Sequence, residues 1–209
     1  MVFYKQNMIV QNKTLKYNIL IFIALLGIFS IYSDNLEMVT VSTVPQSVED
    51  FLAIRDSIAT TPEGGVAVFL LAMMKYGENE ELGLKFLTIA FDQQNLTAGD
   101  TYKGFKIHNS WDYHLGRLKK KPYWAFAYIE GAKPENGYKT SLPYKFQFVR
   151  NRFSVIEKDQ KIKTFVKCYG VSPRPVTMVK NNKDLWKVFE VSSLFVDVTP
   201  PVVNKNDDL

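Results

Sequence analysis

Cysteine is nearly absent from this chain of 209 residues, in which Cys168 stands alone. A single cysteine cannot form an internal disulfide, so the small disulfide-stapled folds are excluded and stability must come from a hydrophobic core. Cys168 alternates with Lys167 and Tyr169 in a strand-like run and shares a strand face with Ile162 and Val166. This pattern predicts a small buried hydrophobic side chain rather than a reactive thiol.

Histidine is also scarce, because His108 and His114 are the only two. Both lie in one polar and aromatic cluster, with Trp111 and Asp112 between them. Zinc sites need three or four converging ligands, so two histidines and one carboxylate in an expected loop predict neither a metal nor a cofactor. The alternative is a general-base site formed by the same three residues. Trp111 is expected at the edge of the core.

Sequence motifs of catalysis are missing too. Ser192 and Ser193 follow an expected strand, but no Gly-x-Ser-x-Gly turn surrounds them, and the sequence indicates no residue that could act as their general base. Gly64-Gly65 stands at a helix start without the Lys-Ser/Thr pair of a phosphate-binding loop, which favours close helix packing. The sequence therefore favours a protein that is not an enzyme.

The longest N-terminal apolar run, Ile19–Tyr32, has 14 residues, whereas about 20 are needed to span a membrane. Three lysines precede the run, and Ser33 follows it. This order is typical of a secretory signal peptide. We predict a signal peptide over residues 1–33, cleavage near Ser33, and export to the periplasm or the cell exterior. An N-terminal membrane anchor is the alternative.

A large net charge of one sign is lacking once that segment is set aside. It carries three of the 26 basic residues and no acidic one, which leaves 23 basic against 21 acidic residues. No nucleic-acid partner is therefore predicted. The charge is nevertheless divided, with net −8 over 34–101, net +13 over 102–183 and net −3 over 184–209. Either the two halves neutralise each other, or the basic half binds an anionic envelope polymer, a lipid headgroup or an acidic protein.

Apolar residues are plentiful, at 46% of the chain with 14% aromatic, which is enough for one domain core. Helices are expected to begin after Ser47, Thr61 and Asn79, which are N-cap residues followed by acidic first turns. The second helix is apolar on all sides from Val66 to Met74, which predicts burial on most sides. Gly77 is expected to end it.

The second half of the chain reads as strands. The run Tyr123–Ile129 is almost wholly apolar and predicts a central strand. Trp186 is expected to be buried against the helix around Phe69–Met73. The further expected strands, of which the last two are joined by a turn at 181–184, are Tyr144–Phe148, Lys161–Tyr169, Pro175–Lys180 and Leu185–Val191.

Helices followed by antiparallel strands predict an α+β fold, with N-terminal helices packed on a curved antiparallel sheet. The expected organisation is a signal peptide (1–33), a linker (34–44), one α+β domain (45–198) and a disordered tail (199–209).

The most suggestive surface feature is the run Lys119-Lys120-Lys121 followed by Pro122-Tyr123-Trp124. Three adjacent ammonium groups stay in water, and the aromatic rings beside them could stack on a sugar or contact lipid headgroups. The alternative is a solvated loop that leads into a core strand. The candidate binding residues are therefore Lys119, Lys120, Lys121, Tyr123, Trp124, His108, Asp112 and His114.

Two resemblances accompany these patterns. The helix start Thr61–Val66 and the hairpin from Arg174 to Val188 are similar to parts of NTF2-like cone domains. The stretches Tyr123–Gly131, Pro143–Val149 and Trp186–Val198 resemble a family of exported bacterial proteins whose domain has no assigned function. That resemblance implies no catalytic residues. We expect a non-enzymatic binding module of the envelope or secreted space, and the alternative is a hydrolase-like enzyme with a pocket at the open end of a cone.

Overall fold

The computed structural model describes residues 35–150, 153–154, 161–196 and 198–202. The expected signal peptide, residues 1–33, and positions 203–209 of the expected tail lie outside the described residues. Among the residues described, no helix is both long and apolar enough to cross a membrane.

Three helices begin where the sequence predicts them: α2 (Val48–Ile58), α3 (Pro62–Glu78) and α4 (Glu80–Ala90). Their N-cap side chains accept hydrogen bonds from the first turns, from Asp50 N to Ser47, from Gly64 N to Thr61 and from Leu82 N to Asn79. Every residue of α3 from Pro62 to Tyr76 is buried, which confirms that this helix lies inside the domain.

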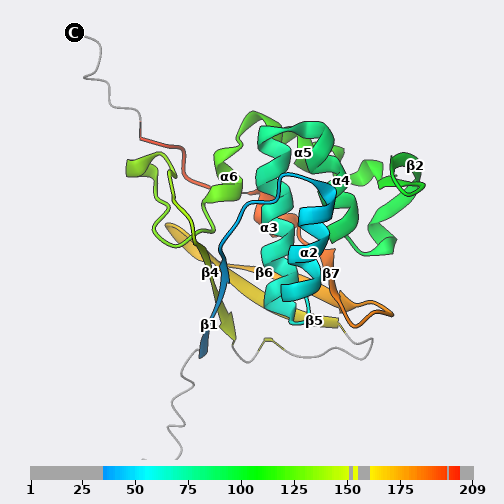
Figure 1. Ribbon diagram of the computed structural model, residues 1–209. Coiled ribbons are helices and arrows are strands. Elements are labelled where there is room, and N and C mark those ends of the chain that lie inside the picture. The colour runs from blue at the N-terminus through cyan, green and yellow to red at the C-terminus, as the bar shows by residue number, and fades with distance from the viewer. Residues whose placement is uncertain (1–34, 151–152, 155–160, 197, 203–209) are drawn as a thin grey trace, which may run out of the picture. The chain divides into compact units, whose positions relative to one another are not determined.

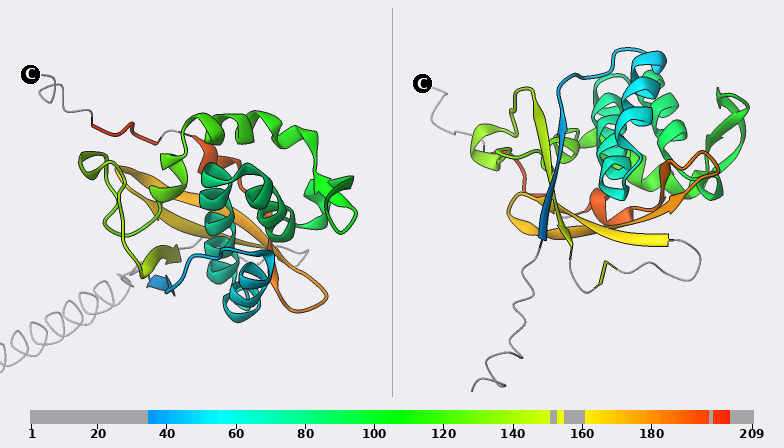
Figure 2. Two further views of the ribbon diagram at one scale, coloured as in Figure 1. Left: turned by 45° about the horizontal axis from the view of Figure 1, so that its top comes forward. Right: turned by 60° about the horizontal axis from the view of Figure 1, so that its bottom comes forward.

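The described sheet of five strands is antiparallel, and the helices cover one of its faces (Figure 1, Figure 2). This arrangement confirms the α+β prediction. The strands in their order across the sheet are β1 (Asn35–Val41), β4 (Tyr144–Arg150), β5 (Lys161–Cys168), β6 (Val171–Lys180) and β7 (Trp186–Glu190).

Strand β1 lies in the segment 34–44 that was expected to be a linker. It pairs with β4 at all seven of its positions, from Asn35 opposite Arg150 to Val41 opposite Tyr144. Leu36 and Met38 are exposed on one face of β1, and Val41 is buried on the other. The alternation was hidden in the sequence because apolar side chains occur on both faces of this edge strand.

The predicted central strand Tyr123–Ile129 is wrong. Residues Tyr123–Phe126 form the short helix α6, and only Ile129 makes an isolated bridge, to Phe146 of β4. A short apolar run has no periodicity that separates a buried strand from a buried helical turn, so tertiary packing decided the outcome. Helix α5 (Asp112–Lys120) precedes it, where the sequence predicted a loop.

A small hairpin was not predicted. It consists of β2 (Leu96–Tyr102) and β3 (Phe105–Ile107), and it projects from the helical layer beyond α4 (Figure 1). Its tip, Lys103-Gly104, has positive φ angles of 48° and 85°, as a tight two-residue hairpin turn requires. Gly104 was the one local signal of this turn.

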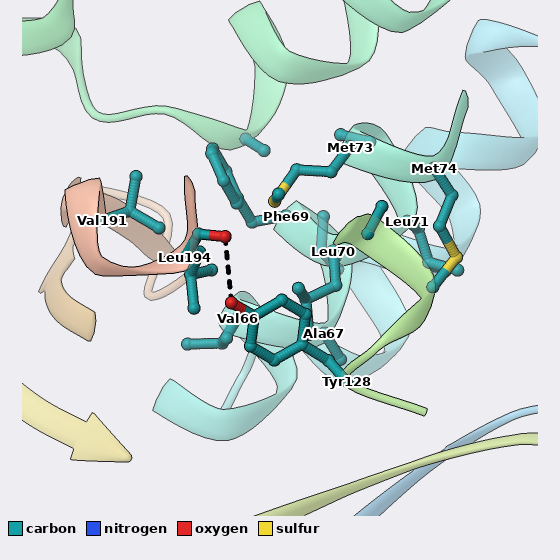
Figure 3. Close-up of a cluster of buried hydrophobic side chains, with 14 of the residues drawn as sticks. Val66, Ala67, Phe69, Leu70, Leu71, Met73, Met74, Tyr128, Val191 and Leu194 are labelled. Carbon is teal, nitrogen blue, oxygen red and sulfur yellow. Dashed lines mark hydrogen bonds between the residues drawn. The ribbon is translucent and has the colours of Figure 1, made fainter. Parts of the chain in front are cut away.

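The centre of the core lies between α3, the segment around Tyr128 and the short helix η4 (Ser192–Phe195) (Figure 3). The buried Tyr128 hydroxyl donates a hydrogen bond of 2.9 Å to the Leu194 carbonyl, and burial raises the pKa of Tyr128 well above its ordinary value. The Tyr128 phenol therefore provides the Leu194 carbonyl with a hydrogen-bond donor inside the core. Cys168 is also buried, as predicted.

Trp186 does not occupy its expected place. It is half-buried near the start of α3. Its backbone N–H donates a hydrogen bond to the Ala59 carbonyl, and its backbone carbonyl lies close to Gly65. The rings that pack on Phe69 are those of Phe91 and Phe195, at centroid distances of 4.9 and 6.4 Å. These two aromatic residues, which follow α4 and end η4, fill the space that was assigned to the tryptophan.

The beginning of the expected disordered tail is attached to the domain. The Tyr138 hydroxyl donates to the Thr199 carbonyl at 2.6 Å, and Val202 N donates to the Pro134 carbonyl at 3.0 Å. Residues 199–202 are therefore held by long-range hydrogen bonds, which a composition argument could not foresee.

Candidate functional site

The structure spreads the histidine cluster over two short elements. His108 is exposed and caps the 3-10 helix η2 (Asn109–Trp111) by accepting a hydrogen bond from Ser110 N. His114 lies on α5 against Trp111 and Phe195, where burial and then the charge of Arg117 lower its pKa. Trp111 is buried at the core edge, as predicted.

The two histidines and the exposed Asp112 form no hydrogen bond with one another. Within the described part of the chain, no three histidine, cysteine or acidic side chains gather in a way that could hold a metal ion. A general base needs a partner within hydrogen-bond reach, and the geometry of this cluster supplies none between these side chains.

The lysines 119–121 lie at the C-terminal end of α5 and not in a loop before a strand. All three are exposed, and the Lys119 ammonium forms an ion pair of 2.5 Å with Glu80 in the first turn of α4. This pair joins the basic and the acidic halves of the chain, so part of the charge asymmetry is neutralised within the domain.

The aromatic rings beside these lysines are covered by the protein itself. Trp124 is buried beneath Arg117 and Lys121, whose charged groups lie 4.7 and 5.2 Å from its ring centroid. Tyr123 stacks on Tyr138 at 5.5 Å. Trp124 therefore offers no free face on which a sugar could stack, and Tyr138 occupies one face of the half-buried Tyr123.

Two adjoining hollows lie elsewhere, where β4 and β5 diverge. These strands pair only at Phe148–Val166 and Val149–Phe165. The segment Ala127–Ala132 fills the gap, because Tyr169 N donates to the Ala127 carbonyl and Glu130 N to the Lys145 carbonyl. The hollows have volumes of about 560 and 290 Å³ and share Glu130 and Gly131. We call them together the Glu130 groove.

The Glu130 groove is mainly cationic. Lys139, Lys145 and Lys167 line it, against the one carboxylate of Glu130. Glu130 accepts a hydrogen bond from Gln147 and lies 3.8 Å from the Lys145 ammonium. The ammonium groups of Lys139 and Lys167 have no ion-pair or hydrogen-bond partner among the described side chains. Two positive charges are therefore available to a ligand.

Uncharged groups complete the groove. The ring of Tyr169 is 40% exposed, and the Thr140 hydroxyl is buried with no hydrogen-bond partner in the described structure. Cys168 also lies along the groove, but burial raises its pKa to about 11, so its thiol is not a nucleophile at neutral pH. The groove can bind and orient an anionic, hydroxyl-rich molecule.

A third hollow, of about 520 Å³, lies around Lys187 between the end of α4, the β2–β3 hairpin and the β6–β7 turn. It shares no lining residue with the Glu130 groove. Burial lowers the pKa of Lys187 to about 8.

Comparison with protein families gives a match over residues 43–202, to the family described as a domain of unknown function (DUF6935). The chain belongs to this family. The DUF6935 domain thus covers the described helices and every strand of the five-stranded sheet except β1, and it agrees with the resemblance to a family without an assigned function. No curated protein and no solved structure matches the chain, so the resemblance of the DUF6935 domain to NTF2-like cone domains gains no support.

The residues of the Glu130 groove were missed by sequence reasoning. Lys139 lies in the loop before β4, Lys145 lies on β4 and Lys167 lies on β5, so no single sequence motif contains all three. The net charge of +13 over 102–183 was the only signal. It located the basic half of the DUF6935 domain but not the place where its charges converge.

Proposed function

We propose that this DUF6935 domain is a non-enzymatic binding module of an exported protein, and that its Glu130 groove binds an acidic polysaccharide. The observation that carries the proposal is the convergence of Lys139, Lys145 and Lys167 on two adjoining hollows. Two of these lysines lack a partner among the described residues, so the groove presents positive charge that the fold itself does not use.

The shape of the groove favours a polymer over a small anion. Two hollows that share a rim can hold consecutive units of a chain, and the exposed Tyr169 ring offers a face for a sugar. The unpartnered Thr140 hydroxyl can exchange a hydrogen bond with a sugar hydroxyl. Lysine ammonium groups suit a flexible carboxylated chain because they need no fixed bidentate geometry.

The groove favours binding over hydrolysis. Neither histidine lines it, and Ser141 has no hydrogen bond to a base among the described residues. A nucleophile without an adjacent base is weak at neutral pH. No specific observation therefore favours the hydrolase-like alternative.

Binding of polygalacturonate, measured by calorimetry with uncharged dextran as control, tests the proposal. Each lysine near an anionic surface contributes about 1 kcal/mol, so replacing Lys139, Lys145 and Lys167 by Gln should weaken binding by about 100-fold. The melting temperature should hardly change, because exposed charges stabilise folds little. Binding by the wild-type protein should also weaken steeply when the salt concentration rises from about 50 to about 300 mM, because the Debye length becomes shorter.

The matched control replaces Lys119, Lys120 and Lys121 by Gln, which removes the same charge from α5. It should retain most of the binding. An equal loss of binding in both triple variants would mean that binding depends only on the net charge of the protein. A larger loss in the α5 variant would mean that the polymer binds at α5. Either result would overturn the assignment to the Glu130 groove.

A further inference from the structure

Lys187 is an unusual lysine because it is half-buried and yet its ammonium is not paired. No ion pair or hydrogen bond joins its ammonium to another described residue. The charged groups that face it are Arg55, Asp56 and Asp92, of which Arg55 and Asp56 pair with each other at 2.6 Å. The repulsion by Arg55 adds to the cost of burial, and the two carboxylates offset only part of it.

One wall of the hollow around Lys187 is apolar. Phe91 and Leu96 contribute to it, and the ring of Phe105 on the hairpin is 39% exposed at its edge. An exposed aromatic side chain beside a concave surface gives up its contact with water when an apolar ligand enters. The volume of about 520 Å³ is within the range of small-molecule sites.

Amide groups form the rim of the hollow. The side-chain oxygen of Asn181 accepts hydrogen bonds from Lys183 N and Leu185 N. Its side-chain N–H groups have no acceptor among the described residues and are available to a ligand. Gln93 and Asn182 also line the hollow. An ammonium group, amide donors and an apolar wall together are the complement of an amphipathic anion.

We propose that the hollow around Lys187 is a second ligand site, for a small organic carboxylate with an apolar or aromatic body. The carboxylate would pair with the Lys187 ammonium, and the body would lie against Leu96 and Phe105. A single negative charge fits better than two, because Asp92 and the carbonyl end of α4 already place negative potential beside the site. The site is independent of the Glu130 groove.

The probe is phenylacetate, compared with phenylacetamide, which has a similar shape but no charge. We expect phenylacetate to bind at pH 7 and phenylacetamide to bind at least about tenfold more weakly, because the unpaired ammonium gains a charge-assisted contact only from the anion. Phenyl phosphate should bind more weakly than phenylacetate. Equal binding of the amide, or tighter binding of the phosphate, would overturn the proposal.

The dependence on pH identifies the group that binds. Only the protonated amine attracts the anion, so with a pKa of about 8 the affinity should fall about tenfold between pH 7 and pH 9. Lys187→Met should lose both the binding and its pH dependence, which separates Lys187 from Arg55, Asp56 and Asp92. Lys183→Met, in the neighbouring turn outside the hollow, should bind like the wild-type protein.

The folded state of Lys187→Met is checked by thermal unfolding, which should stay cooperative with a midpoint no lower than that of the wild-type protein. Unaltered phenylacetate binding in this variant, or a constant affinity from pH 7 to pH 9 in the wild-type protein, would rule out Lys187 as the anchoring group. No detectable phenylacetate binding by the wild-type protein would overturn the site itself.

Discussion

The carboxylate of Glu63, in the first turn of α3, is joined to the guanidinium of Arg150, at the end of β4, by two hydrogen bonds of 3.1 Å. Glu63 is only 2% exposed, and Thr164 of β5 donates a further bond to it at 3.3 Å. Arg150 also lies 3.2 Å from Glu37 of β1. One buried carboxylate thus ties the central helix directly to β4 and β5 and, through Arg150, to β1.

This arrangement predicts a strong effect when one partner is removed. Arg150→Met should lower the free energy of unfolding by about 3–5 kcal/mol, because it leaves the Glu63 carboxylate buried without a counter-charge. Glu63→Met in the same background should restore most of that loss. Urea denaturation of the two single variants and the double variant measures both effects. A double variant less stable than Arg150→Met would contradict this explanation.

The exposed pair of Lys145 and Glu130 is the matched control for that experiment. Its atoms are 3.8 Å apart and both side chains are more than 40% exposed. Lys145→Met should therefore change stability by less than about 1 kcal/mol.

Close packing of α3 on α4 depends on Gly83. A Cβ atom at this position would overlap the backbone of Tyr76, which cannot move without shifting α3. Gly83→Ala should destabilise the domain by about 3 kcal/mol or more, because overpacking against backbone cannot be relieved by a rotamer change.

Gly116 in α5 provides the opposite case in a helix of the same domain. Nothing lies within 4 Å of a Cβ atom placed there, and the residue is exposed. Gly116→Ala should therefore stabilise the domain by about 0.5–1 kcal/mol, through helix propensity alone. Thermal unfolding of both variants compares them directly, and a stabilising Gly83→Ala would show that the two helices are less closely packed.

The lowered pKa of Lys187 predicts a dependence of stability on pH. Its pKa falls from the ordinary 10.5 to about 8 in the folded state, so between these values the unfolded chain binds a proton that the folded domain does not. Stability from this group therefore increases with pH across that window. At pH 7, Lys187→Met should be more stable than the wild-type protein by about 3 kcal/mol.

That advantage should shrink from pH 8 upward and vanish near pH 10.5. The thiol of Cys168 and the phenols of Tyr76 and Tyr138, whose pKa values are raised by burial, titrate in both proteins and cancel in the difference. Chemical denaturation at a series of pH values measures it. A difference that stays constant with pH would mean that the substitution acts through packing only.

The expected signal peptide leads to a direct test. Secretion of the full chain by a bacterial host should yield a mature protein that begins near Asp34, because the apolar run before it is too short to span a membrane. N-terminal sequencing of the secreted or periplasmic product decides the matter. An intact N-terminus in the membrane fraction would establish the anchor instead.

Local sequence patterns were sufficient for the first three helices, α2, α3 and α4, and for most of the sheet. Ser47, Thr61 and Asn79 mark helix starts through bonds to amides three residues away, and such short-range interactions can be read from a sequence. The turn at 181–184 is likewise closed by the side chain of Asn181 on Lys183 and Leu185.

The misreadings share a different physical cause. The run Tyr123–Ile129 has no local preference that distinguishes a helical turn from a strand. Its first part forms α6, and from Ala127 onward the chain enters the gap between β4 and β5. Trp186 was displaced by the rings of Phe91 and Phe195, which reach α3 from other parts of the chain. Both outcomes depend on contacts between distant residues.

The sequence by itself determined the class of fold, the starts of α2, α3 and α4, the burial of Cys168 and the presence of a basic half. Only the tertiary structure decided which basic residues are paired within the domain and which are available to a ligand. Lys119 is paired with Glu80, whereas Lys139 and Lys167 converge without partners among the described residues, and partial burial lowers the pKa of Lys187. The reason is that charge and hydropathy are properties of single residues, while pairing and desolvation depend on which distant residues the fold brings within a few ångströms.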